Sequence, residues 1–225
     1  VRGAELIKAA GVVLYDAAVP QVVRDLADAE ATVTCADVDD KDKEIAAADR
    51  AKAAIEAAKT GVDVVRLVAG DPVVDGALAA EGPAIAKAKL TFEVVPGVPA
   101  ATAVPGYAGI PLLGGKSHQV HVVDASDPVD WTKHIDSTST LVLLGAGPRI
   151  EDIAAGLLAA GRNERTPIAV TVGGSTTDQR TTVGTLDHVS ELAKPLAALG
   201  DLTDAIVVIG ESVAARERLS WFETK

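Results

Sequence analysis

The chain has 225 residues, of which 48% are hydrophobic but only 3% aromatic, so it can bury a sizeable core built mainly from Ala, Val, Leu and Ile. Its formal charge of −11 argues against non-specific nucleic-acid binding, which depends on Lys and Arg neutralising phosphates. The single cysteine, Cys35, excludes an internal disulfide. No apolar run approaches the roughly 18 residues that span a membrane, and no signal peptide is visible. We therefore expect a cytoplasmic protein with neither a nucleic-acid nor a membrane partner.

Short apolar runs alternate with helical patterns through the first half of the chain. The sequence predicts helices over residues 2–10, 19–27, 44–60, 76–87 and 100–105. It predicts strands over residues 12–15, 31–35, 64–68 and 92–95, with a charged loop over residues 37–43. We expect the strand at 64–68 to be buried, because it is short, apolar and rich in β-branched side chains.

The second half repeats this alternation after a glycine-rich linker at residues 113–117. Strands are predicted over residues 120–123, 141–144, 168–172, 181–185 and 205–209, of which 181–185 is expected to be a short return strand. Helices are predicted over residues 150–160 and 189–199. We therefore expect an α/β protein with two lobes, residues 1–114 and 115–225, each with a mainly parallel sheet covered by helices.

Two of the first-half strands end in turns of small residues. The strand at 64–68 runs into Ala69-Gly70-Asp71-Pro72, and the strand at 92–95 runs into Pro96-Gly97. Open α/β sheets bind small molecules at the carboxyl ends of their strands, so these turns predict a ligand cleft. For Asp71 the alternative is that its carboxylate simply caps the following helix.

Other motifs do not predict a site. The GGKS sequence at 114–117 is not a phosphate-binding loop, because the earlier glycine that such a loop requires would fall at Ile110. His118 and His121 would lie on opposite faces of a strand, which makes a shared metal ion improbable, and no metal is expected. His134 is isolated in the sequence and predicted to be an ordinary surface residue.

Two segments carry a family resemblance. AGDPVVDG at residues 69–76 and FEVVPGVPAATAVPGYAGIPLL at residues 92–113 resemble the paired signature of the tetrapyrrole methylases, closest to the uroporphyrinogen-III C-methyltransferases of sirohaem and cobalamin synthesis. LSWFE at residues 219–223 resembles the end of the methylase domain in the variant fused to a uroporphyrinogen-III synthase. In that family a strand and a GxGPGD loop precede the segment matched by the start of this chain, so we expect the sequence to continue a longer protein.

The resemblance implies a function and a set of residues. It implies a two-lobed fold with a cleft between the lobes, a homodimer, and S-adenosylmethionine-dependent C-methylation of uroporphyrinogen III towards precorrin-2, with S-adenosylhomocysteine as product. It makes Asp16 the proton acceptor, although a solvated carboxylate at a strand end is an equally good interpretation. The positions that match cofactor contacts are Ala69, Gly70, Asp71, Val74, Pro99, Ala100, Leu144 and Gly174.

Several residues depart from the family pattern. Pro99 replaces a threonine or serine that donates a hydrogen bond, and Leu144 replaces a methionine of similar volume. Ala77 and Ala80 stand where an arginine and a glutamate hold the substrate, Glu81 is expected to point elsewhere, and the family's lysine near residues 35–39 is missing. We therefore expect weak cofactor binding and slow turnover or none. A methylase-like domain that supports a fused or associated uroporphyrinogen-III synthase, and a methylase for another corrin precursor or a non-tetrapyrrole, remain alternatives.

Overall fold

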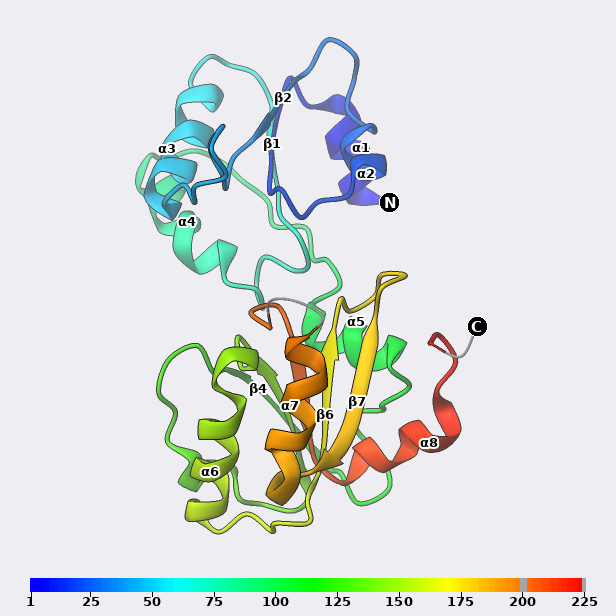
Figure 1. The fold of residues 1–225 in the computed structure, drawn as a ribbon. Coiled ribbons are helices and arrows are strands. Elements are labelled where there is room, and N and C mark those ends of the chain that lie inside the picture. Colours follow the sequence, from blue (N-terminus) through cyan, green and yellow to red (C-terminus); the bar gives the residue numbers. More distant parts are fainter. Residues whose placement is uncertain (199–201, 224–225) are drawn as a thin grey trace. The chain divides into compact units, whose positions relative to one another are not determined.

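A computed structural model describes residues 1–198 and 202–223 and divides into two compact units, Val1–Pro99 and Ala100–Lys225 (Figure 1). This division falls earlier than the expected boundary after Gly114. The reason is helix α5 (Ala100–Tyr107), which packs on the sheet of the second unit rather than belonging to the first. In the described residues no helix is both long and apolar enough to cross a bilayer.

The first unit has a small parallel sheet, as predicted. Its strand order is β2-β1-β3, formed by β1 (Val12–Tyr15), β2 (Thr32–Cys35) and β3 (Val64–Leu67). The predicted strand at 12–15 is confirmed at both ends. The helices are α1 (Arg2–Ala9), α2 (Gln21–Arg24), α3 (Ala47–Ala58) and α4 (Ala77–Lys87), so the predicted helix at 19–27 forms only its central turn.

Helices cover both faces of this sheet because apolar residues fill successive positions of the strands. Val13 packs with Ile7 of α1 and residues that follow α2, whereas its neighbour Leu14 packs with Ala54 of α3. Successive side chains of a strand point to opposite faces, so both faces of β1 need a covering layer. Figure 1 shows α1 and α2 on one side of the strands and α3 on the other.

The predicted strand at residues 92–95 is wrong. These residues are not assigned to a strand, and in the part of the chain that the structure describes no ladder joins them to β3. Apolar side chains alone do not make a strand, because its N–H and C=O groups need a neighbouring backbone. A side-chain contact attaches the segment to the rest of the unit, because Glu93 forms an ion pair with Arg2 at 2.7 Å. Phe92 remains 48% exposed.

The second unit has a mixed sheet, which corrects the expectation of a mainly parallel one. Its order is β4-β5-β8-β6-β7, and only the β4–β5 pair is parallel. The β6–β7 connection is a hairpin, too short for the crossover that parallel neighbours need. The strands are β4 (Gln119–Asp124), β5 (Ser139–Leu144), β6 (Pro167–Val172), β7 (Arg180–Thr185) and β8 (Ile206–Ile209).

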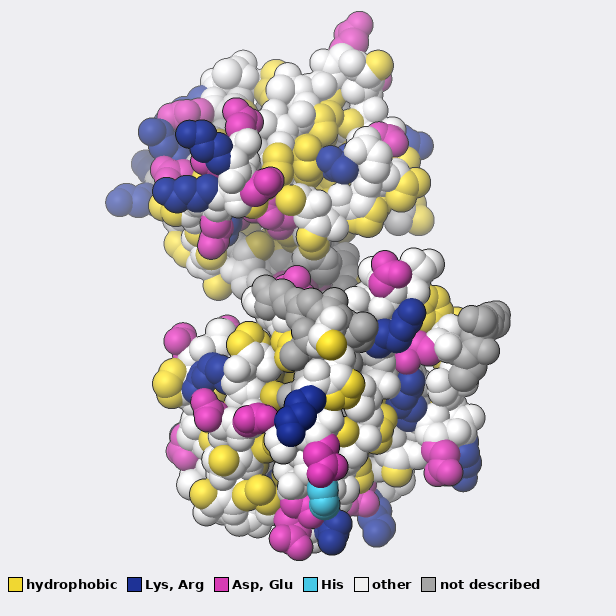
Figure 2. Space-filling view, in the orientation of Figure 1, with side chains coloured by type: hydrophobic (Ala, Val, Ile, Leu, Met, Phe, Trp, Pro, Cys, Tyr) yellow, Lys and Arg dark blue, Asp and Glu magenta, His cyan; other side chains and the backbone are white. Residues whose placement is uncertain are grey.

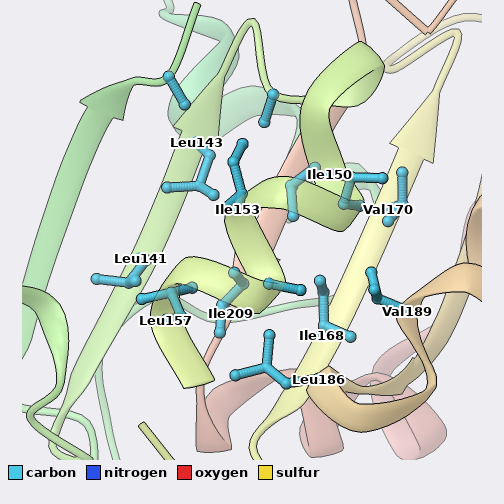
Figure 3. Close-up of a cluster of buried hydrophobic side chains, with 14 of the residues drawn as sticks. Leu141, Leu143, Ile150, Ile153, Leu157, Ile168, Val170, Leu186, Val189 and Ile209 are labelled. Atoms are coloured by element: carbon cyan, nitrogen blue, oxygen red, sulfur yellow. The ribbon is translucent and has the colours of Figure 1, made fainter. Parts of the chain in front are cut away.

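Two longer helices, α6 (Ile150–Ala160) and α7 (Val189–Ala197), cover one face of this sheet and enclose the largest core. Figure 3 shows Ile153 and Leu157 of α6 pointing at Leu141 and Leu143 of β5. The other face packs against α5. The predicted end of the α7 helix at Leu199 lies outside the described residues. Shorter helices are α8 (Arg216–Leu219) and the 3-10 turns η1 (Trp131–His134), η2 (Gly147–Arg149), η3 (Leu186–His188) and η4 (Glu211–Ala215).

Candidate functional site

The turn after β3 is organised by the carboxylate of Asp71. Its Oδ1 accepts hydrogen bonds from the backbone N–H groups of Val73 at 2.8 Å and Val74 at 3.1 Å. Its Oδ2 accepts one from the N–H of Gly97 at 2.8 Å, across 26 positions of sequence. The N–H of Asp71 itself donates to Oδ2 of Asp75 at 2.6 Å. The two small-residue turns predicted from the sequence therefore meet within the first unit.

These contacts shape the acidity of Asp71. The hydrogen bond from Gly97 does most to lower the pKa of the carboxyl group, and the N–H groups of Val74 and Val73 add to the effect. Burial acts in the opposite direction and does not cancel them, so the pKa lies below the ordinary Asp value. Asp71 is therefore a carboxylate anion at neutral pH. It does not cap helix α4, whose N-terminal residue is preceded by Gly76.

Glycine is required at both turns. Gly70 has φ of 80°, a left-handed conformation, and a Cβ added there would lie 2.1 Å from a carboxylate oxygen of Asp75. A Cβ on Gly97 would lie 2.0 Å from the carbonyl oxygen of Gly70. Because that obstacle is backbone, no rotamer change can relieve it. Gly97 was visible in the sequence as part of a Pro-Gly turn, but this contact was not predictable from it.

Ala69 and Gly70 offer their backbone to a ligand. Both residues are exposed, and within the described chain no residue accepts a hydrogen bond from their N–H groups. Neither carries a side chain larger than methyl. This combination fits a ligand held through main-chain N–H and C=O groups, as the resemblance implies for the methionine part of the cofactor.

Asp16 lies at the same edge of the sheet as this turn. It follows β1 directly, and β1 and β3 are parallel neighbours in which Tyr15 is paired with Leu67. The segments after the two strands must therefore emerge side by side. The Asp16 carboxylate is not simply solvated: its Oδ1 lies 2.6 Å from Nη2 of Arg66, and its side chain is 19% exposed.

Arg66 links Asp16 to a buried glutamate. Its Nε and Nη2 donate to the two carboxylate oxygens of Glu81 at 2.9 and 3.0 Å, and Arg50 Nε donates to Glu81 Oε1 at 3.0 Å. Burial lowers the pKa of Arg66, but the hydrogen bond to Glu81 and the charge of Asp16 outweigh it, so the net pKa is raised. The four side chains form one ion-pair chain in which Glu81 is shared.

A cavity of about 400 Å³ opens beside this ion-pair chain. Ala77 and Ala80 line it together with Asp16, so the two departures from the family pattern adjoin the expected catalytic group. Glu81 lines it too, although the sequence placed its side chain elsewhere. The full lining is Asp16, Asp37, Arg50, Arg66, Asp75, Gly76, Ala77, Ala80 and Glu81.

The remaining cofactor candidates divide between the units. Val74 belongs to the Asp71 turn and is 40% exposed, and Pro99 ends the first unit. In the second unit Ala100 and Leu144 pack on one apolar cluster of α5, β5 and β8. Gly174, after β6, belongs beside them, because a Cβ there would lie 2.4 Å from a methyl carbon of Val104 in that cluster.

One histidine pair was missed. His121 faces His134 rather than His118, with the two Nδ1 atoms 3.1 Å apart. Burial, then the charge of His121, lowers the pKa of His134, which corrects its interpretation as an ordinary surface residue.

No group of three or more His, Cys, Asp or Glu among the described side chains could hold a metal ion. On the face visible in Figure 2, Asp and Glu are interspersed with Lys and Arg in both units.

Sequence comparisons show which known proteins this chain resembles. A family model of the tetrapyrrole (corrin/porphyrin) methylases matches residues 1–190. Siroheme synthase 1 of Klebsiella pneumoniae is 36% identical over 230 residues, covering 99% of this chain and 47% of that protein. The siroheme synthase of Sodalis glossinidius is 34% identical over 227 residues, covering 98% and 47%. The chain thus spans about half the length of the curated relatives it matches.

Solved structures share the fold. Uroporphyrin-III C-methyltransferase from Thermus thermophilus, in complex with S-adenosyl homocysteine, has 27% identity and a TM-score of 0.72 and covers 95% of this chain and 91% of that one. A cobalt precorrin-4 methyltransferase has a TM-score of 0.76 at 20% identity, covering 95% and 89%, which is a likeness of fold alone.

Proposed function

Since the chain belongs to the tetrapyrrole (corrin/porphyrin) methylase family, we propose that it transfers methyl groups from S-adenosylmethionine to ring carbons of uroporphyrinogen III, towards precorrin-2 in sirohaem and cobalamin synthesis. The observation that carries the proposal is the common sheet edge of Asp16 and the Ala69–Gly70 turn. A candidate proton acceptor and a candidate cofactor turn with free amides emerge there from neighbouring parallel strands.

The bound cofactor would supply an activated methyl group on a sulfonium. The chain's residues would position it: the N–H groups of Ala69 and Gly70 would hold its methionine part, and positioning is worth much of the barrier in a two-partner displacement. Asp16 would accept the proton that the methylated ring carbon releases. Arg66 keeps the Asp16 carboxylate in one place at 2.6 Å. In the second unit, Ala100, Leu144 and Gly174 are the proposed cofactor contacts.

The departures from the family pattern support slow turnover. Pro99 has no N–H or hydroxyl to donate, and losing one hydrogen bond to a charged partner costs about 1.5–3 kcal/mol, or roughly ten- to a hundredfold in affinity. Ala77 and Ala80 place no charge in the cavity beside Asp16. We therefore include in the proposal a domain of reduced activity that supports a fused or associated uroporphyrinogen-III synthase. We also propose that the protein is a homodimer in the cytoplasm.

A second substrate class is favoured by the charge of that cavity. Four carboxylates line it against two guanidinium groups, and both of those groups are engaged by Glu81. Any substrate carboxylate that enters this cavity would be repelled, a cost that a tetrapyrrole with fewer carboxylates, or a non-tetrapyrrole, would more easily avoid. Methylation of such a substrate is the alternative.

Calorimetric titration with S-adenosylhomocysteine, followed by turnover assays with uroporphyrinogen III, tests the proposal. Wild-type protein should bind the ligand, and Asp16→Asn should keep that binding while losing turnover. Ala77→Arg combined with Ala80→Glu should raise turnover. Absence of binding would refute the methylase proposal, and binding without turnover on uroporphyrinogen III would favour the scaffold or the second substrate class. Light scattering that returns only monomer mass at micromolar concentration would count against the homodimer.

A further inference from the structure

We propose that Asp71 is a positioning residue, whose carboxylate locks the cofactor turn to the Pro96-Gly97 turn instead of contacting the ligand. This inference rests on the proposed function and concerns the same site. It separates two roles that the sequence could not separate. The backbone before Asp71 would bind the cofactor, and the side chain of Asp71 would hold that backbone in shape.

The carboxylate of Asp71 faces backbone N–H groups and not solvent. Both of its oxygens already accept backbone N–H groups, and the residue is only 6% exposed, while Ala69 and Gly70 beside it are exposed. The side chain is thus turned away from the surface that the backbone presents. A helix cap or a local turn would account for the bonds from Val73 and Val74. It would not account for the bond from Gly97, which comes from a distant segment.

The two turns approach each other closely. The space between Gly97 and the carbonyl of Gly70 excludes even a methyl group. Asp75 closes the opposite side, because its carboxylate accepts the N–H of Asp71 and lies against Gly70. The exposed amides of the cofactor turn are therefore fixed by contacts on both sides. A site built on main-chain groups depends on such support, since displacements of about 0.5 Å already disturb it.

Two substitutions test the lock. Asp71→Asn keeps the size of the side chain, but its NH₂ group must face either Gly97 or the local N–H groups, so one set of bonds is lost. Asp71→Ser keeps a local acceptor but is too short to reach Gly97. Asp39→Asn is the matched control, because Asp39 accepts two local N–H groups in the same unit, from Lys41 and Lys43 at 2.8 and 3.0 Å.

The measurements are amide hydrogen exchange at Gly97 by NMR and calorimetric affinity for S-adenosylhomocysteine. Both Asp71 variants should speed exchange at Gly97 and weaken the ligand by roughly tenfold or more, and the Asp39 variant should change neither. Weaker binding without faster exchange would mean that the side chain touches the ligand, and faster exchange with unchanged affinity would mean that the lock does not serve binding. Either result overturns the inference. Wild-type protein that fails to bind would instead refute the proposed function, and the exchange data would still decide whether Asp71 joins the turns.

Discussion

Glutamine in place of Glu81 should destabilise the first unit by about 3–5 kcal/mol, the range found when one partner of a buried ion pair is removed. The Glu81 side chain is 4% exposed and serves Arg66 and Arg50, whose side chains are 13% and 16% exposed. Glutamine has the same size, so it leaves no cavity. It removes the carboxylate charge that Arg66 and Arg50 share, so that Asp16 remains the partner of Arg66 alone. In addition, its NH₂ must face a guanidinium N–H in place of one acceptor oxygen.

Calorimetric unfolding of the whole chain measures this effect. For a unit of about 100 residues, a loss of 3 kcal/mol lowers the transition temperature by about 12 °C or more. Glu56→Gln is the matched control, because Glu56 is 65% exposed and lies 3.9 Å from Lys52 on the same helix face, where a pair contributes about 0.5 kcal/mol or less. If Glu81→Gln costs less than about 1 kcal/mol, water or other groups stabilise the two arginines and the ion-pair chain is not a structural unit.

Three further perturbations follow from the packing. Gly97→Ala should lower the free energy of unfolding by about 1–3 kcal/mol through the clash with the Gly70 carbonyl, and it should weaken S-adenosylhomocysteine binding in calorimetry. The control is Gly3→Ala in helix α1, where the added Cβ has its nearest neighbour at 3.9 Å, so this change should stabilise the fold by up to about 1 kcal/mol. Leu157→Ala, at a fully buried position, should cost about 2–5 kcal/mol in thermal unfolding, and a cost below about 1 kcal/mol would contradict the core assignment. Acid should destabilise the fold. Carboxyl groups whose pKa is lowered in the native state stabilise the fold at pH values above their unfolded pKa near 4, and this contribution is lost as the pH falls through their native pKa. Urea unfolding that shows constant stability from about pH 6 to pH 2 would refute this. The groups concerned are Asp71, Asp124, Asp136, Asp187 and Glu223.

The first unit was largely predictable because its signals are local. The short apolar run that follows Gly11 marks a strand, and β1 was predicted at its true ends. Direction and pairing are not local. The mixed sheet of the second unit depends on which strands become neighbours, and the only sequence signal was the short connection between β6 and β7. Residues 92–95 show the same limit, since their pattern suits a strand but their backbone has no ladder in the described chain.

The site divides along the same line. The Ala69–Asp71 turn and Asp16 were predicted as separate motifs, but their common sheet edge follows from the pairing of β1 with β3. Glu81 was misjudged, although it is the only charged residue in the apolar stretch from 76 to 86, which is a signal for a buried pair. Its partners Arg66 and Arg50 lie 15 and 31 positions away in the chain, beyond the reach of helix periodicity.

The charge of the cavity constrains how a polycarboxylate could bind. Arg66 donates to Glu81 and pairs with Asp16, and Arg50 donates to Glu81 and to the carbonyl oxygen of Ile45, so neither guanidinium is free to leave its partners without exposing a buried carboxylate. Ala77 and Ala80 widen the space beside them without adding charge. On the proposed function, the carboxylates of the substrate would therefore point away from this cavity, and the part of the ring that approaches Asp16 would be apolar or carry N–H groups. A reduced tetrapyrrole would meet that requirement at its pyrrole nitrogens and ring carbons, so the proposed ring methylation would be compatible with the acidic cavity only in that orientation.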